Sequence, residues 1–196
     1  MLAVNWDMAL AVESEIELPA SVTGTFNAFY KVDLHVENPS LNNDTVQSTS
    51  DLPEPPFHDR SPKALCTQFH QITPSLLALA DHPLCPQGPI SMLNFVSYHP
   101  YPSAVESYQK YLDGVRAGPA KRYGNFVKLK GSPTPSGKGE WDLVFMAHYP
   151  SFKHFVDMGL DPEYQELNRR YRMPALRDLC ILMTTEVDLA WPVTES

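Results

Sequence analysis

The sequence contains little of what marks several common classes of function. Its 196 residues include only three cysteines, Cys66, Cys85 and Cys180, without a C-x-x-C spacing, so we expect reduced thiols rather than disulfides. The seven histidines show neither H-x-x-x-H nor H-E-x-x-H spacing, and no glycine-rich phosphate loop or G-x-S-x-G elbow occurs. We therefore expect no metal site, no nucleotide cofactor and no serine-hydrolase chemistry.

Basic charge and long apolar runs are also scarce. The formal net charge is −8 and no run of Lys or Arg exceeds two residues, which argues against a nucleic-acid partner because phosphate neutralisation needs a basic surface. No apolar run reaches the length of a membrane span, and the N-terminus meets Asp7 early without a basic leader. We expect a cytoplasmic protein with neither a membrane nor a nucleic-acid partner.

Proline is abundant instead, with 19 residues against nine glycines, and its clusters divide the chain. Residues 26–36, "FNAFYKVDLHV", alternate as a half-buried strand, and residues 2–12 show the same parity. Residues 37–62 are rich in Pro, Ser, Asn and Asp and predict a long loop or linker. We therefore divide the chain into an N-terminal strand pair with a Pro/Ser-rich linker (1–62) and a second domain (63–196).

The second domain predicts a regular succession of helices and strands. Residues 63–81 predict helical pieces broken at Pro74. Ser103 and Glu106 form an S-x-x-E capping box for a helix that Gly118-Pro119 ends, while Ser151 and Asp161-Pro162 begin two more. The predicted strands are 90–98, 120–131, 141–149 and 179–187. The order from residue 90 is β-α-β-β-α-β, an α+β ferredoxin-like arrangement with helices on one face of an antiparallel sheet; a second copy can cover the other face.

Several stretches of this domain resemble one known family. They are "SMLNFVSY", the tyrosine-bearing first helix, "WDLVFMAHYPS", "DPEYQ" and the pattern R-x-x-A-L-R-D. The family is that of the small dimeric α/β-barrel proteins, mostly of unknown function, related to the EthD-like proteins and the antibiotic-biosynthesis monooxygenases. The resemblance runs from about Ser75 to Val187, and residues 1–62 depart from the family pattern.

The resemblance implies a homodimer whose two sheets form a barrel, with a ligand cavity in each subunit between sheet and helices. Relatives use such cavities for cofactor-free oxygenation, for isomerisation, cyclisation or decarboxylation, and for haem breakdown. A fold hosts many chemistries, so the candidate residues need their own argument.

His148 is the first candidate, because an imidazole moves protons near neutral pH. It shares strand parity with Val144 and Met146, and it stands at a strand end where loops admit a ligand. We predict that it faces the cavity, although a histidine bonded to backbone at a strand end is the alternative. His154 is predicted to lie on the exposed side of a short helix.

Asn94 and Arg172 are the next candidates. Asn94 interrupts an apolar strand, so its amide either bonds neighbouring backbone or points into the cavity. Arg172 either binds a carboxylate or enolate oxygen or pairs with Asp178 or Glu166. Tyr98 completes the predicted catalytic set, and the predicted ligand contacts are His99, Tyr108, Met146 and Tyr164.

These residues predict a cofactor-independent isomerase, cyclase or lyase that acts on a small, apolar, oxygenated molecule, aromatic or derived from a polyketide. Such chemistry needs a base, an oxyanion partner and a dry pocket. The alternatives are a cofactor-free monooxygenase and an accessory protein that binds a small molecule without reaction.

Overall fold

An antiparallel sheet organises the part of the chain that this computed structural model describes, namely residues 30–33, 72–133 and 141–185. Within these residues five strands lie in the order β1-β3-β4-β2-β5, and every neighbouring pair is antiparallel. The strands are β1 (Tyr30–Asp33), β2 (Ile90–Tyr98), β3 (Phe126–Pro133), β4 (Leu143–Tyr149) and β5 (Leu176–Thr185). The N-terminal strand β1 extends the edge of the sheet beside β3.

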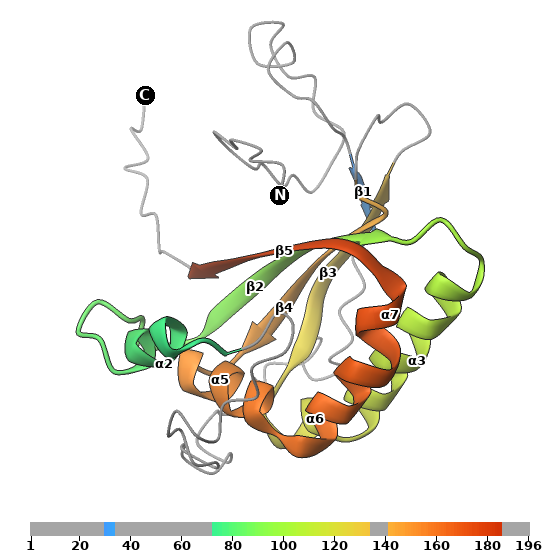
Figure 1. The fold of residues 1–196 in the computed structure, drawn as a ribbon. Coiled ribbons are helices and arrows are strands. Elements are labelled where there is room, and N and C mark those ends of the chain that lie inside the picture. Colours follow the sequence, from blue (N-terminus) through green and yellow to red (C-terminus); the bar gives the residue numbers. More distant parts are fainter. Residues whose placement is uncertain (1–29, 34–71, 134–140, 186–196) are drawn as a thin grey trace, which may run out of the picture.

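The helices cover one face of this sheet (Figure 1). They are α2 (Pro74–Ala80), α3 (Ser103–Ala117), α4 (Pro119–Arg122), α5 (Phe152–Leu160), α6 (Pro162–Leu167), the π-helical turn η3 (Asn168–Arg172) and α7 (Met173–Ala175). From β2 to β5 the chain has the β-α-β-β-α-β order and the strand arrangement of the ferredoxin-like fold. The predicted α+β fold class is confirmed.

The pairing register assigns each strand residue to one of two faces. Asn94 lies opposite Phe145 and Ile181, whereas Leu93 lies opposite Met146 and Leu182. Directly opposed residues of antiparallel strands share a face. The ring of Tyr149, on the same parity as Phe145, contacts Phe155 of α5, which identifies the helix-covered side. We call this side the inner face (Met92, Asn94, Phe145, Ala147, Tyr149 and Ile181) and its opposite the outer face (Leu93, Val144, Met146, His148 and Leu182).

Helix α3 closes the inner face as its periodicity predicts. Ala104, Tyr108, Tyr111 and Val115 are buried and recur at helical spacing. The predicted capping box is wrong, however, because Pro102 already has helical angles and occupies the cap position without a side-chain bond. Ser103 is thus the first helical residue and cannot cap the helix.

The connection from α3 to β3 also differs from the prediction. Residues 120–131 were expected to form one strand, yet the first part is the short helix α4, with Pro119 at its first position. Proline is favoured there because its fixed φ suits a helix and its missing N–H is not needed. Gly124 then turns the chain with a φ of 62°, a left-handed conformation that favours glycine. Strand β3 therefore begins only at Phe126.

The other predicted boundaries agree more closely. Ser151 caps α5 and Asp161 caps α6, as predicted. Helix α2 begins at Pro74 rather than breaking there, with Thr73 as its cap, and β5 begins at Leu176 instead of residue 179. The predicted exposed position of His154 is wrong: the residue is buried, and its Nδ1 lies 2.8 Å from the Ser151 Oγ.

The predictions for the N-terminal region fall mainly outside the described residues. Residues 30–33 form a strand inside the predicted segment 26–36. The predicted strand at 2–12, the linker 37–62 and the helical pieces before residue 72 lie outside. Of the helices in the described ranges, none combines the length and apolar character needed to cross a membrane.

Candidate ligand-binding site

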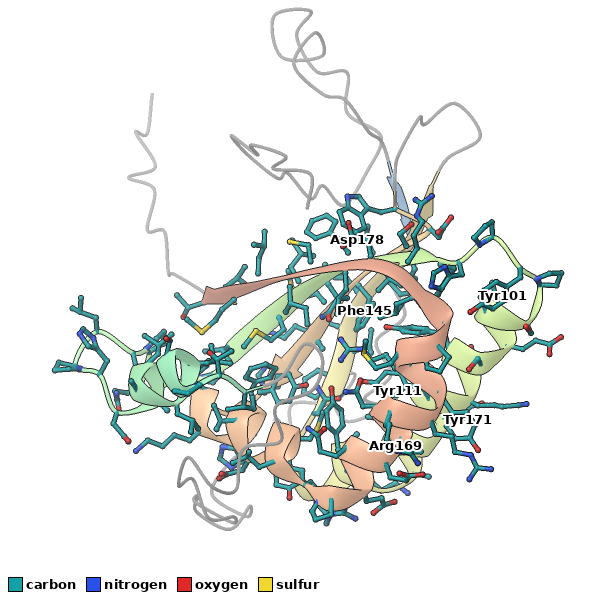
Figure 2. The ribbon with its side chains drawn as sticks, in the orientation of Figure 1. Tyr101, Tyr111, Phe145, Arg169, Tyr171 and Asp178 are labelled. Carbon is teal, nitrogen blue, oxygen red and sulfur yellow. The ribbon has the colours of Figure 1, made fainter. Side chains whose placement is uncertain are left out.

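A cavity of about 630 Å³ lies between the inner face and the helices. Its volume falls in the range of small-molecule sites, roughly 300–1,000 Å³. The sheet supplies a largely apolar wall, which includes Met92, Leu143, Phe145, Ala147, Tyr149 and Ile181. The helices supply polar groups opposite, chiefly Tyr111, Tyr164 and Arg172. Figure 2 shows Phe145 and Tyr111 between the sheet and the helices, whereas Arg169 and Tyr171 lie on the outer side of the helix layer.

Arg172 is the most unusual group of this cavity. Its side chain is 4% exposed, and its guanidinium carbon lies 5.4 Å from the centre of the Tyr111 ring. Its Nη1 donates to the Tyr164 hydroxyl and to Asn168 Oδ1, both at 3.3 Å. In the described part of the chain no carboxylate pairs with it, and Glu166 instead binds Arg169 at 2.7 Å. A buried charge is costly unless an opposite charge compensates it, so this cation is prepared for an anionic oxygen.

Tyrosine rings make up much of the environment of Arg172. Burial alone would lower the pKa of this guanidinium, but the oxygens of Tyr111, Tyr164, Tyr108 and Tyr149 outweigh burial and raise it. The group is therefore a cation at every pH at which the protein is folded. Burial raises the pKa of Tyr108 to about 12 and also raises the pKa values of Tyr111 and Tyr149. These hydroxyls are neutral hydrogen-bonding groups at physiological pH.

Tyr164 carries the hydroxyl on which two donors converge. The Tyr111 hydroxyl donates to it at 3.1 Å and Arg172 Nη1 at 3.3 Å. A phenol oxygen accepts through two lone pairs and donates one proton, so the proton of Tyr164 is directed away from both donors. Tyr164 lines the cavity, and its hydroxyl is the candidate donor to a ligand there.

Local structure holds Tyr164 and Arg172 in place. Asp161 caps α6 by accepting hydrogen bonds from the backbone N–H groups of Glu163 at 2.7 Å and Tyr164 at 3.2 Å. Its other oxygen accepts from the Tyr123 hydroxyl at 2.8 Å and from Arg122 at 2.9 Å, which ties α6 to the end of α4. Beyond α6 the backbone widens into the π-helical turn Asn168–Arg172, a conformation often found at functional sites.

Three of the predicted site residues come together at the cavity: Asn94, Tyr164 and Arg172. The Asn94 amide nitrogen donates to the Met92 carbonyl at 2.8 Å. Both interpretations of Asn94 therefore hold, because the residue lines the cavity while it bonds backbone. The alternative pairing of Arg172 with Glu166 is not made, since Glu166 binds Arg169.

The prediction that His148 faces the cavity is wrong. His148 and Met146 belong to the outer face, opposite Ser91 and Leu93 respectively, and neither lines the cavity. The His148 ring lies 4.5 Å from the ring of Phe126, measured between centroids. His148, Met146 and Val144 do share one side of the strand, as predicted, but this side faces away from the helices and not toward them.

Tyr98, His99 and Tyr108 do not line the cavity either. Tyr108 is buried beside Tyr98, with ring centroids 5.3 Å apart, and packs in the core. His99 stacks on Tyr101 at the end of β2, with ring planes 12° apart. The prediction that these three residues contact a ligand is therefore not supported by the lining of this cavity.

Sequence reasoning missed Tyr111, Phe145, Ala147 and Tyr149 as cavity residues. A signal was present, because Trp141, Leu143, Phe145, Ala147 and Tyr149 are uniformly apolar or aromatic, whereas the other parity contains Asp142 and His148. The more apolar parity of a half-covered sheet faces the helices. Among the described residues, no three His, Cys, Asp or Glu side chains gather as metal ligands.

Comparisons with known proteins place this geometry among the ferredoxin-like proteins. No protein-family model matches the sequence, and no curated protein matches it. The RPA0582 protein of unknown function from Rhodopseudomonas palustris is 30% identical, with 59% of this chain and 94% of that chain covered and a TM-score of 0.49. For its methylated form the identity is 29%, the coverage 61% and 95%, and the TM-score 0.50.

Two further solved structures are more distant. A dimeric ferredoxin-like protein of unknown function from Thermobifida fusca is 17% identical, with 53% of this chain and 96% of that chain covered and a TM-score of 0.41. A protein from Caulobacter crescentus, proposed to be an antibiotic biosynthesis monooxygenase, is 16% identical, with coverage of 54% and 95% and a TM-score of 0.41. The neighbours agree with the predicted relationship, and they establish no activity for this chain.

Proposed function

We propose that this chain, which belongs to the same family as the RPA0582 protein of unknown function, binds a small, largely apolar carbonyl compound and converts it without a cofactor. The reaction class is isomerisation, cyclisation or elimination through an enolate. The observation that carries the proposal is the buried guanidinium of Arg172, which meets the cavity without a carboxylate partner in the described residues.

The shape and polarity of the site support an enolate. Enolisation moves negative charge onto a carbonyl oxygen, and donors fixed in a dry site stabilise that charge strongly. Arg172 supplies the positive charge. Tyr164 accepts hydrogen bonds from Tyr111 and Arg172. Its own hydroxyl proton therefore points away from both and can be donated to a ligand.

The apolar wall supports the choice of substrate. Phe145, Ala147 and Tyr149 lie opposite the polar groups, so a ring or an alkyl chain can pack there while the carbonyl meets Arg172. Because His148 lies on the outer face, we assign the proton transfer to Tyr164. Its hydroxyl gives its proton to the carbonyl oxygen, and the resulting phenolate, beside Arg172, takes the proton from the adjacent carbon, so that the tyrosine ends neutral again.

Deuterium exchange tests the proposal with one simple ketone. Propiophenone in deuterated buffer exchanges the two hydrogens next to its carbonyl only through its enol, and NMR measures the rate. The native chain should accelerate this exchange, and Tyr164→Phe should lower the acceleration about a hundredfold, as removal of an acid catalyst does.

Tyr171→Phe is the matched control, because Tyr171 is on the neighbouring turn and outside the cavity lining; it should exchange at the native rate. If propiophenone bound without any exchange, the chain would be a binding protein and not an enzyme. Oxygen consumption during turnover would indicate a cofactor-free monooxygenase instead.

A further inference from the structure

The charged residues that line the cavity are all cations, although the protein as a whole is acidic. The chain has 23 Asp and Glu against 15 Lys and Arg. The charged residues of the lining are Arg116, Lys121, Lys130 and Arg172, and no Asp or Glu is among them. A concave surface lined by one sign of charge raises the local concentration of ligands of the opposite sign.

Three of these cations lie at the solvent side of the cavity, in contrast to Arg172. Arg116, Lys121 and Lys130 are exposed, and they come from α3, α4 and β3 respectively. Three consecutive elements therefore place positive charge around the same space, whereas Arg172 is buried.

Three nearby carboxylates already pair with arginines. Asp113 pairs with Arg116 at 3.3 Å, and Asp161 and Glu163 pair with Arg122 at 2.9 and 2.7 Å. Among the side chains that the structure describes, no carboxylate forms an ion pair with Lys121 or Lys130. We call the solvent side of the cavity, with Arg116, Lys121 and Lys130, its mouth. The ammonium groups of Lys121 and Lys130 are the charges at this mouth that can bind a ligand.

We infer that the substrate carries a second oxyanion, a carboxylate or a phosphate, which Lys121 and Lys130 hold at the mouth while the carbonyl oxygen meets Arg172. This inference rests on the proposed function and names its substrate class: an acidic ketone with an apolar body between its two oxygen-bearing ends. A lysine ammonium is a point charge that binds a carboxylate and a phosphate alike. The geometry therefore predicts a negative group at this position and does not distinguish between the two.

Three ketones of matched reactivity test the inference in the exchange assay. They are propiophenone, 3-benzoylpropionate, which adds a carboxylate, and 2-benzoylethylphosphonate, which adds a phosphonate in place of a phosphate. The native chain should prefer the acidic ketones over propiophenone by about tenfold in kcat/KM, which corresponds to two partly exposed ion pairs within a positive mouth. The ratio between the two acids tells which oxyanion fits.

The double variant Lys121→Gln/Lys130→Gln should abolish this preference. It should raise KM for the acidic ketones and leave kcat unchanged, because the lysines bind the substrate and its transition state equally. The matched control is Lys110→Gln/Lys153→Gln, which removes the same charge away from the cavity lining and should keep the preference.

The outcomes separate the inference from the function on which it rests. Exchange of all three ketones at equal kcat/KM, or a preference that survives in Lys121→Gln/Lys130→Gln, would overturn the second-oxyanion site and leave the proposed function standing. Failure of all three ketones to bind or exchange would overturn both.

Discussion

The inner and outer faces of the sheet are built from the same strands, and they differ in what each face meets. On the inner face, Asn94 and Phe145 look across a cavity toward Tyr111 and Arg172. On the outer face, Leu93, Met146 and His148 belong to the opposite parity of the same strands, and the helices lie on the other side of the sheet (Figure 1). Neighbouring residues of one strand therefore face either the candidate reaction site or the candidate contact with a second copy.

The polar residues of the two faces also differ in what surrounds them. Arg172 is buried among tyrosine rings, so its charge is little screened by water and acts strongly on a ligand. His148 has an imidazole suited to proton transfer but lies on the outer face, away from the cavity. A suitable side chain is thus not enough, because the face on which it lies decides what it can contact.

Replacement of the inner-face cation should produce the largest effect. We expect Arg172→Met to lower the enzyme-dependent exchange of propiophenone about three-hundredfold, as loss of one preorganised oxyanion donor does. The melting temperature should fall by only a few degrees, because methionine fills the space while Asn168 and Tyr164 each lose one hydrogen bond. Exchange by NMR and thermal unfolding of the same sample measure both.

Two controls sharpen the contrast between the faces. Arg170→Met removes a guanidinium that packs on Tyr171 outside the cavity, and His148→Ala removes the outer-face imidazole. Both should exchange propiophenone within about twofold of the native rate, since neither touches the reacting atoms. A large loss of rate in His148→Ala would contradict the assignment of the chemistry to the inner face.

Loss of the Asp161 side chain should weaken the helix layer that covers the inner face. Asp161→Ala removes the cap of α6 and the acceptor of Tyr123 and Arg122. We expect the free energy of unfolding to fall by about 2 kcal/mol, roughly half from the lost cap and half from the lost buried acceptor. Urea titration measures the loss, and Asp161→Asn should lose less because asparagine also caps helices.

The same residue should make stability depend on pH. Burial acts to raise the pKa of the Asp161 carboxyl, but hydrogen bonds from Tyr123, Arg122 and two backbone N–H groups outweigh burial and lower it. Because the folded pKa lies below the unfolded value, this contribution is complete above the unfolded pKa and is lost as the pH falls through the folded one. Native protein should therefore lose more stability than Asp161→Asn on acidification, and parallel curves would contradict this.

The smallest expected effect concerns the outer face, through which we propose that two copies associate. Leu182 is 42% exposed on this face and lies opposite Leu93. Leu182→Asp should raise the dimer dissociation constant about tenfold, because a charge would have to be buried in the contact. Light scattering over a dilution series measures this, with Leu84→Asp, at a residue 84% exposed, as control. A monomeric native chain at micromolar concentration would contradict the proposal.

Local sequence signals determined most of the elements. The alternation in 90–98 and 141–149 and the spacing of Tyr108, Tyr111 and Val115 gave strands and a helix where they occur, because periods of 2 and 3.6 reflect one buried side of each element. The dipeptide Asp161-Pro162 marked the start of α6, since a cap and a proline in the first turn act within a few residues.

The candidate site depended on contacts between elements. The sequence showed that His148 and Met146 share one side of a strand, but only the pairing of β4 with β2 and the packing of α5 on Tyr149 decided which side meets the helices. Likewise Arg172 appeared as a cation able to pair with Glu166, and only the π-helical turn and the packing of Tyr111 and Tyr164 buried it away from that carboxylate. Periodicity is a property of one segment and can be read along the chain, whereas burial and the choice of partner belong to pairs of segments and exist only once these have packed.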